Sequence, residues 1–182
     1  MQALARLEGW IAQFNDWVLA AFKWLAIALL ASMLIIVDVA VFMRYVMNDA
    51  LAWSEEIAKF VMVWLTFVVA PIGLRMGAHV GIEVLIGHLK GRLRQLVLIL
   101  IFAGIIGLMV VFVKEGSFMT WNARIQRAST IDISILYVYI CMPVGSFMVA
   151  TVALEYMINA IRGLIDPSQA RAEPSHELVQ AE

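Results

Sequence analysis

Asp38 is the residue of this chain with the clearest potential for chemistry, because it is the only charged side chain in an apolar run from Trp24 to Met43. A carboxylate surrounded by lipid is costly, and such residues commonly bind ions or carry protons. Asp38 lies near the end of the run, however, where a pair with Arg44 or Lys59 would neutralise it. We therefore expect a structural pair, with ion or proton handling and contact with a partner protein as the alternatives.

The residue types that most often bind metals or haem are poorly placed for it. His79 and His88 share one connecting segment and His176 lies near the end of the chain, so none is inside an apolar run. Haem in a membrane bundle needs histidines on facing helices, and zinc needs several ligands at close spacing. The single cysteine, Cys141, suits a small apolar filling role. We expect no catalytic residue, no metal and no cofactor, and hence no enzyme.

Four apolar segments take up most of the chain and indicate its fold class. Each is close to the roughly 20 residues that cross the hydrocarbon of a bilayer as a helix. Hydrophobic residues make up 63% of the chain and charged residues 15%, and the net charge of −1 gives no sign of nucleic-acid binding. The predicted spans are residues 24–43, 57–74, 95–113 and 133–154. We predict an all-α integral membrane protein, with one four-helix domain over residues 1–165 and a polar, disordered tail over residues 166–182.

The N-terminal segment, residues 4–22, has the pattern of an amphipathic helix lying in the membrane interface. Apolar residues alternate at spacings of three and four, which places them on one helical face. The members of this apolar stripe are Leu4, Leu7, Ile11, Phe14, Val18, Ala21 and Leu25. Trp10, Trp17 and Trp24 repeat every seven residues beside it, and indole favours the interface. Packing on a partner protein is the alternative. We expect the segment to be retained, because no small-residue cleavage site follows the first span.

The distribution of lysine and arginine predicts the orientation in the membrane. With four spans, both termini and the 75–94 segment lie on one side, which carries eight basic residues against five on the other. Lys90, Arg92 and Arg94 lie directly at the end of a span, where the rule that basic residues stay in the cytoplasm is strongest. We predict that both termini are cytoplasmic.

The start of the second span carries polar residues with predictable roles. Ser54 is a plausible N-cap, and Glu55 and Glu56 in the first turn suit the positive end of the helix dipole. Lys59 follows the two glutamates by four and three residues, so we expect ion pairs along one helix face.

Proline, glycine and polar residues mark the expected irregularities. Pro71 is expected to kink or end the second span and Pro143 to bend the fourth, since proline removes a backbone hydrogen bond. Residues 80–86, flanked by glycines, have the pattern of a short amphipathic or partly inserted helix. The 114–132 loop is expected to begin as a continuation of the third helix.

Two neighbouring runs of residues together resemble a known family. The first comprises Arg44-Tyr45, Leu51-Ala52-Trp53-Ser54-Glu55-Glu56-Ile57-Ala58-Lys59 and Trp64-Leu65-Thr66-Phe67. The second is Arg75-Met76-Gly77-Ala78-His79-Val80-Gly81-Ile82-Glu83. In this combination, and with four spans behind an amphipathic N-terminal segment, the chain resembles the small membrane subunit of TRAP transporters, the tripartite ATP-independent periplasmic transporters. That subunit is called the DctQ-like or Q component.

The resemblance implies a role in transport. In that family the small subunit binds a larger membrane subunit, which carries the substrate and sodium sites, and a periplasmic binding protein delivers the solute. The solute is commonly an organic acid such as a dicarboxylate or sialic acid. The small subunit would brace the static scaffold while the large subunit moves its transport domain as an elevator, all within the bacterial inner membrane. The residues that would be structural or subunit-contact residues are Arg44, Trp53, Ser54, Glu55, Glu56, Lys59, Trp64, Arg75 and His79.

Two other functions compete with this one. A self-sufficient dimeric exporter would use Asp38 as its proton-coupling carboxylate, as the small multidrug-resistance proteins use an acid well inside their first helix. Those proteins are much shorter, and Asp38 lies nearer to the end of its span. A membrane-bound redox enzyme would need histidines inside the spans, and the sequence has none there. We therefore favour the transporter subunit.

Overall fold

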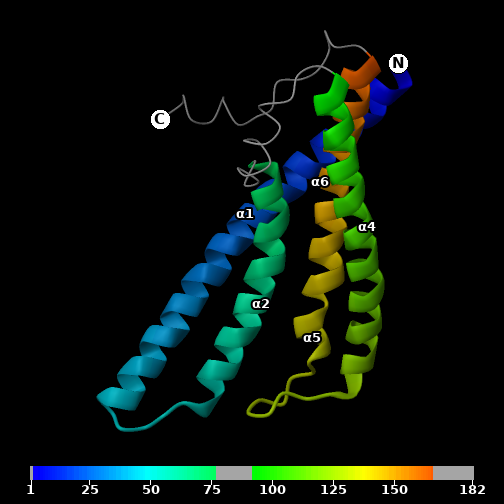
Figure 1. The fold of residues 1–182 in the computed structure, drawn as a ribbon. Helices are drawn as coiled ribbons and strands as arrows, with labels where there is room; N and C mark the ends of the chain where they lie inside the picture. The colour runs from blue at the N-terminus through cyan, green and yellow to red at the C-terminus, as the bar shows by residue number, and fades with distance from the viewer. Residues whose placement is uncertain (1, 77–91, 166–182) are drawn as a thin grey trace, which may run out of the picture.

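The computed structural model describes residues 2–76 and 92–165, and helices dominate both parts (Figure 1). In these residues four helical stretches are long and apolar enough to cross a membrane, which confirms the predicted all-α membrane fold. The elements are α1 (Gln2–Tyr45), α2 (Ala52–Arg75), α4 (Arg92–Asn122), the 3-10 turn η1 (Ala123–Ile125), α5 (Leu136–Tyr139) and α6 (Cys141–Ile165).

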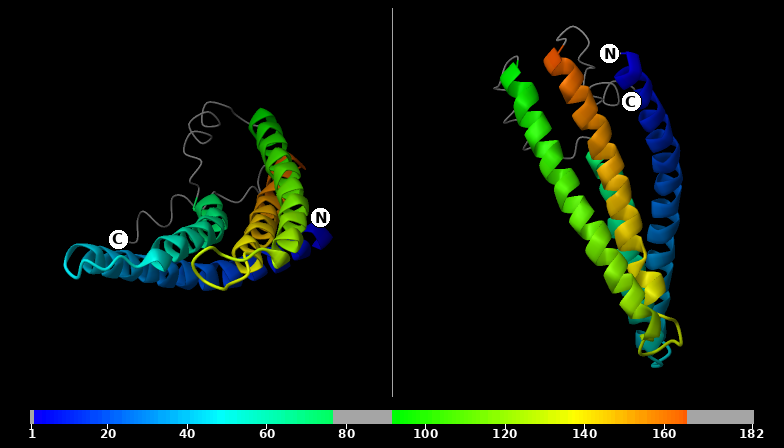
Figure 2. Two further views of the ribbon diagram at one scale, coloured as in Figure 1. Left: turned by 90° about the horizontal axis from the view of Figure 1, so that it is seen from below. Right: turned by 90° about the vertical axis from the view of Figure 1, so that its right-hand side faces the viewer.

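The helices α1, α2 and α4 pack around α6, and α1 and α2 also pack against each other. The start of α1 and the end of α6 lie at one end of the bundle, which we call the terminal end (Figure 1). The α1–α2 link and the α4–α5 link lie at the opposite end, the connection end. Seen along the bundle, α1 lies along one side of the other helices (Figure 2). The side of the membrane on which each end lies stays a prediction.

The first helix is longer than predicted, because α1 continues without a break from Gln2 to Tyr45. The amphipathic segment and the first span are therefore one helix, since no glycine or proline interrupts residues 10–45. The placement of the N-terminal part of α1 in the membrane interface stays a prediction.

The packing face of the first half of α1 lies beside the predicted apolar stripe. Its buried residues are Ala12, Asn15 and Leu19. Phe14, a member of the stripe, is exposed instead, and Trp10, Trp17 and Trp24 are all more than two-thirds exposed. The helix thus has a narrow face toward α6 and a broad apolar face outward.

The start of α2 differs from the prediction. Leu51, in an extended conformation, is the N-cap, and its side chain makes no capping hydrogen bond. The prediction that Ser54 is the N-cap was therefore wrong. Ser54 lies buried in the first turn, where its hydroxyl donates to the Leu51 carbonyl at 2.7 Å. The helix begins at Ala52, earlier than expected, so Ser54 lies within its first turn rather than before it.

The other helices also begin and end at residues that differ from the limits of the apolar runs. Pro71 is buried within α2, which continues to Arg75, so this proline does not end the helix. The helix α4 runs on to Asn122, as the expected continuation into the loop suggested. The fourth span is interrupted at Ile140, between α5 and α6 and close to Pro143, which has no N–H to donate to the preceding turn.

The core of the described residues is small and lies around α6. Its main cluster consists of Leu19, Leu74, Val149, Val152 and Ala153. Beside it the rings of Phe102 and Tyr156 stack with centroids 5.3 Å apart. A Cβ added to Gly145 would lie 2.5 Å from the Phe67 carbonyl oxygen, so a glycine is needed for α6 to approach α2 this closely.

Three sequence predictions lie outside the described residues: the contact role of His79, the short helix over residues 80–86, and the tail over residues 166–182.

Candidate functional site

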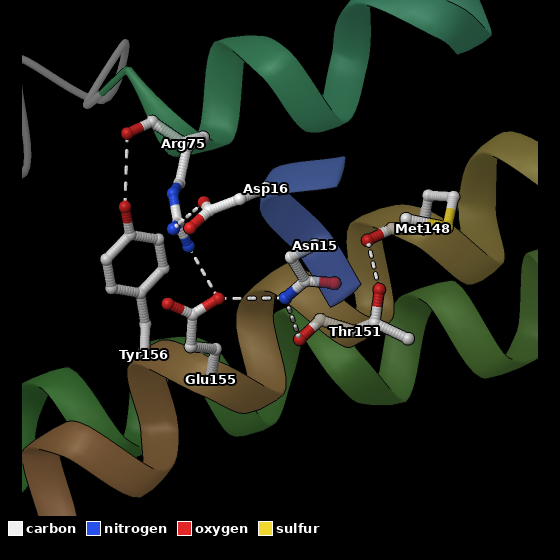
Figure 3. A network of polar contacts seen from close by, with 7 residues as sticks. All are labelled: Asn15, Asp16, Arg75, Met148, Thr151, Glu155 and Tyr156. Atoms are coloured by element: carbon white, nitrogen blue, oxygen red, sulfur yellow. Dashed lines mark hydrogen bonds and ion pairs between the residues drawn. The ribbon is translucent and has the colours of Figure 1, made fainter. Parts of the chain in front are cut away.

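Polar side chains gather in two places, one toward each end of the bundle. The first group, which we call the Arg75 cluster, joins α1, α2 and α6 (Figure 3). Its members are Asn15, Asp16, Arg75, Thr151, Glu155 and Tyr156. The second group, which we call the link cluster, lies at the connection end. Its members are Arg44, Glu55, Glu56, Ser129 and Thr130.

Arg75 is the centre of the first cluster. One guanidinium nitrogen donates to Glu155 Oε2 of α6 at 2.5 Å, and another donates to the Asp16 carboxylate of α1. The hydroxyl of Tyr156 donates to the Arg75 backbone carbonyl at 3.1 Å. This hydrogen bond gives a partner to a carbonyl in the last turn of α2, where carbonyls have no partner within the helix. One arginine on the last turn of α2 therefore holds both neighbouring helices (Figure 3).

Asn15 connects the cluster to the interior. Its Nδ2 donates to Glu155 Oε2 at 2.8 Å and to the Thr151 carbonyl at 3.3 Å, so it binds α6 twice. Asn15 is fully buried, and Glu155 is only 7% exposed. Within the described part of the chain, Asn15 Oδ1 is buried without a hydrogen-bond partner. A carboxylate at such a position is stable only while its cation and its donors stay in place.

The link cluster is more exposed. Arg44, near the end of α1, forms an ion pair with Glu55 of α2 at 2.5 Å, which closes the α1–α2 link. The Glu56 carboxylate accepts the backbone N–H groups of Ser129 and Thr130, each at 2.8 Å, and also accepts the Thr130 hydroxyl. The start of α2 is thereby tied to the α4–α5 link.

Three further contacts lie toward the connection end. The indole of Trp64 donates from Nε1 to the Tyr137 carbonyl at 3.0 Å, which joins α2 to α5. The α4–α5 link folds back on itself through a bridge between Arg127 and Ser134, and the Arg127 side chain pairs with Asp132.

The structure brings some of the predicted residues together and separates others. Arg44 and Glu55 meet each other, whereas Glu56, Trp64 and Arg75 each hold a different helix or link. The predicted ion pairs of Lys59 with the two glutamates are not found among the described residues, because Glu55 turns to Arg44 and Glu56 to the α4–α5 link. Trp53, another of the predicted contact residues, is partly exposed, at 38%.

Asp38 does not form the expected pair. Arg44 is engaged by Glu55, and Asp38 forms no ion pair or hydrogen bond through its side chain with any residue in 2–76 or 92–165. Its side chain is exposed on α1.

Sequence reasoning missed most of the Arg75 cluster. Glu155 follows directly after the predicted end of the fourth span, and Asn15 and Asp16 lie in the segment interpreted as interfacial. A signal was present for Asn15, because it shares a helical face with Ala12 and Leu19 and so is a polar residue on an otherwise apolar face.

The arrangement of these groups holds helices together. In the described part of the chain, no group of three or more His, Cys, Asp or Glu side chains is placed to hold a metal ion. Both clusters use their charged groups to join one helix to another, which is a structural role.

Comparison with known proteins points to one family. Residues 33–163 match the family model described as tripartite ATP-independent periplasmic transporters, DctQ component. The chain is 25% identical over 120 residues to the C4-dicarboxylate TRAP transporter small permease protein DctQ of Vibrio cholerae, covering 66% of this chain and 51% of that protein. It therefore spans about half the length of that relative.

Two other relatives are covered almost throughout. The sialic acid TRAP transporter small permease protein SiaQ of Vibrio cholerae is 25% identical over 147 residues, 80% of this chain and 84% of that protein. A putative TRAP transporter small permease protein of Haemophilus influenzae is 26% identical over 141 residues, 78% of this chain and 82% of that protein.

Proposed function

Because this chain belongs to the DctQ component family of tripartite ATP-independent periplasmic transporters, we propose that it braces the large membrane subunit of such a transporter. The complex would take up an organic acid, delivered by a periplasmic binding protein and driven by sodium. The family and the four apolar helices make the chain a multi-pass protein of the bacterial inner membrane and a component of a TRAP transporter. The bracing role, the sodium coupling and the substrate belong to the proposal.

The observation that supports a bracing role is the polar connection between helices toward both ends of the bundle. The Arg75 cluster ties α1 and α2 to α6, and the link cluster ties α2 to the end of α1 and to the α4–α5 link. The close contact of Gly145 with Phe67 lies between these two clusters, because Phe67 falls between Glu56 and Arg75 along α2. A subunit fixed in this way can serve as a static support, since its helices cannot easily move past one another.

We infer the substrate class from the names of the relatives. Their names give a C4-dicarboxylate for one and sialic acid for another, and both are organic acids. We place the substrate site on the large subunit and both termini of this chain in the cytoplasm. A phosphatase reporter fused after Glu182 should then be inactive and a cytoplasmic fluorescent reporter active, whereas the opposite result would reverse the orientation.

The alternative function, a dimeric proton-coupled exporter using Asp38, has less support. Such a dimer would bring together the Asp38 carboxylates of its two copies, which is unfavourable in a medium of low dielectric. Asp38 lies on the outer surface of α1, away from the packing face.

The test is to purify tagged chain after co-expression with its genomic neighbours, and then to measure transport in liposomes. We expect a large membrane protein to co-purify in stoichiometric amount. Uptake should require that protein, the binding protein, this chain and a sodium gradient together. Purification of this chain alone, as a homodimer that transports without a partner, would overturn the proposal.

A further inference from the structure

The second half of α1 has distinct inner and outer faces. Its half-buried residues repeat at spacings of three and four, as expected of the face that packs on a neighbouring helix. These residues are Ala26, Leu29, Ser32, Met33, Ile36, Ala40 and Met43. Asp38 lies two positions from both Ile36 and Ala40, and two positions correspond to more than half a turn. Its carboxylate is therefore on the outer face.

The surroundings of Asp38 on that outer face are apolar. Its neighbours three or four positions away are Leu34, Ile35, Val41 and Phe42, which are 57%, 64%, 50% and 53% exposed. A carboxylate exposed among side chains of this kind would face hydrocarbon if the surface were bare.

Asp38 lies within the apolar part of α1, in the third of it nearest the connection end. It precedes Arg44 by six residues, so it is about 9 Å along the helix from the pair with Glu55 that marks the polar end. Arginine and lysine can reach the interface from such a depth through long side chains, but aspartate is short. None of the described residues forms an ion pair or hydrogen bond with its carboxylate.

A carboxylate in contact with hydrocarbon is costly, and such residues usually face protein or water. We propose that the outer face of α1 around Asp38 is the surface that contacts the large membrane subunit. That subunit presents a cationic or hydrogen-bond-donating side chain to Asp38. This inference rests on the proposed function, because it assigns the interface of the same complex.

The chemistry of the face favours this occupant over two others. A water-soluble binding protein cannot reach a position inside the apolar part of α1. A second copy of this chain, docked about a two-fold axis at Asp38, would bring two carboxylates together, which is unfavourable in a medium of low dielectric. A membrane helix of another chain can supply both an apolar surface and a complementary group.

The experiment is photocrosslinking in the assembled complex. The crosslinker p-benzoylphenylalanine replaces Ile35, next to Asp38, or Val110 on α4, which is similarly exposed at 59% and is the matched control. We expect an adduct with the large subunit from position 35 and little from position 110.

The outcomes separate this inference from the proposed function. If the large subunit co-purifies but crosslinks from position 110 and not from position 35, the interface assignment is overturned and the bracing role stands. Adducts of this chain with itself from position 35 would overturn the choice of partner. If no large subunit co-purifies with the unmodified chain, both proposals fail together.

Substitution of Asp38 tests the charge itself. Asp38→Leu should lower the recovery of the large subunit about tenfold, because the partner's polar group is left buried and unpaired. Asp38→Asn keeps an acceptor and should keep most of the recovery. If Asp38→Leu recovers as much large subunit as the unmodified chain, or more, the carboxylate has no partner and the inference is wrong.

Discussion

The two polar clusters use the same kinds of side chain in different surroundings. In the Arg75 cluster an arginine pairs with Glu155, and the side chains are 23% and 9% exposed. In the link cluster an arginine pairs with Glu55, and the side chains are 46% and 60% exposed. Both ion pairs have the same distance of 2.5 Å. Geometry alone would make the two pairs equivalent.

The two ion pairs differ in how deeply they are buried, and burial changes what each contributes to stability. An exposed pair exchanges one set of polar contacts for another and contributes little to stability. A buried pair contributes little over a well-packed apolar pair, but losing one partner is costly because the other stays buried and charged. The Arg75 cluster should therefore be sensitive to single substitutions, and the link cluster should tolerate them.

The largest effect is expected from Arg75→Leu. This change leaves Glu155 buried without its cation, and we expect the free energy of unfolding to fall by about 3–5 kcal/mol. Thermal or denaturant unfolding of the purified chain in lipid nanodiscs would measure it. The double variant Arg75→Leu with Glu155→Leu removes both charges and should recover a large part of the loss. A double variant no better than the single one would show that charge burial is not the cause.

Asn15→Ala should have the next largest effect. It removes the two hydrogen bonds that Asn15 donates to α6, and the buried Glu155 loses a donor. We expect a loss of about 1–3 kcal/mol in unfolding free energy. Gln13→Ala, at an exposed position of the same helix, is the matched control and should change little. Equal effects of the two changes would argue against a role for Asn15 in joining α1 to α6.

Glu56→Gln should act locally. The backbone N–H groups of Ser129 and Thr130 would lose a charged acceptor, while the exposed site allows water to replace it. We expect faster hydrogen exchange at these two amides, with little change in global unfolding. Glu115→Gln, at another exposed glutamate, should leave their exchange unchanged. Unaltered exchange in the Glu56 variant would mean that the carboxylate does not hold the α4–α5 link.

The smallest effect is expected from Arg44→Leu, which makes the same chemical change as Arg75→Leu at the exposed end. The unfolding midpoint should stay within the error of the measurement, because water solvates Glu55 once its partner is gone. A loss comparable to that of Arg75→Leu would remove the distinction between the two clusters.

The fold was predictable because the apolar runs are long. Hydropathy identifies the part of a helix that suits lipid, so it located four spans. It does not report where the backbone stops being helical. This is why α1 and α4 extend beyond their predicted ends through residues such as Asp16 and Lys114, which are polar but helical.

The site was predictable only in part. Arg44, Glu55, Glu56, Trp64 and Arg75 were singled out by resemblance, and each makes a contact between elements. The partners of Arg75 could not be found in this way, because Glu155 lies 80 residues and Asp16 59 residues from it along the chain. Such a contact depends on how three helices cross. Ser54 illustrates the opposite error, since a good capping residue lies three positions too late to cap.

The unbroken length of α1 has a mechanical consequence. At 44 residues it is about 66 Å long, roughly twice the thickness of the bilayer hydrocarbon. Its two halves tilt together because no break separates them, and Asn15 fastens the first half to α6. Arg44 fastens the other end to α2, so one rigid rod is held at two points about 44 Å apart along its axis. A change in bilayer thickness would therefore tilt the whole subunit rather than move α1 against its neighbours.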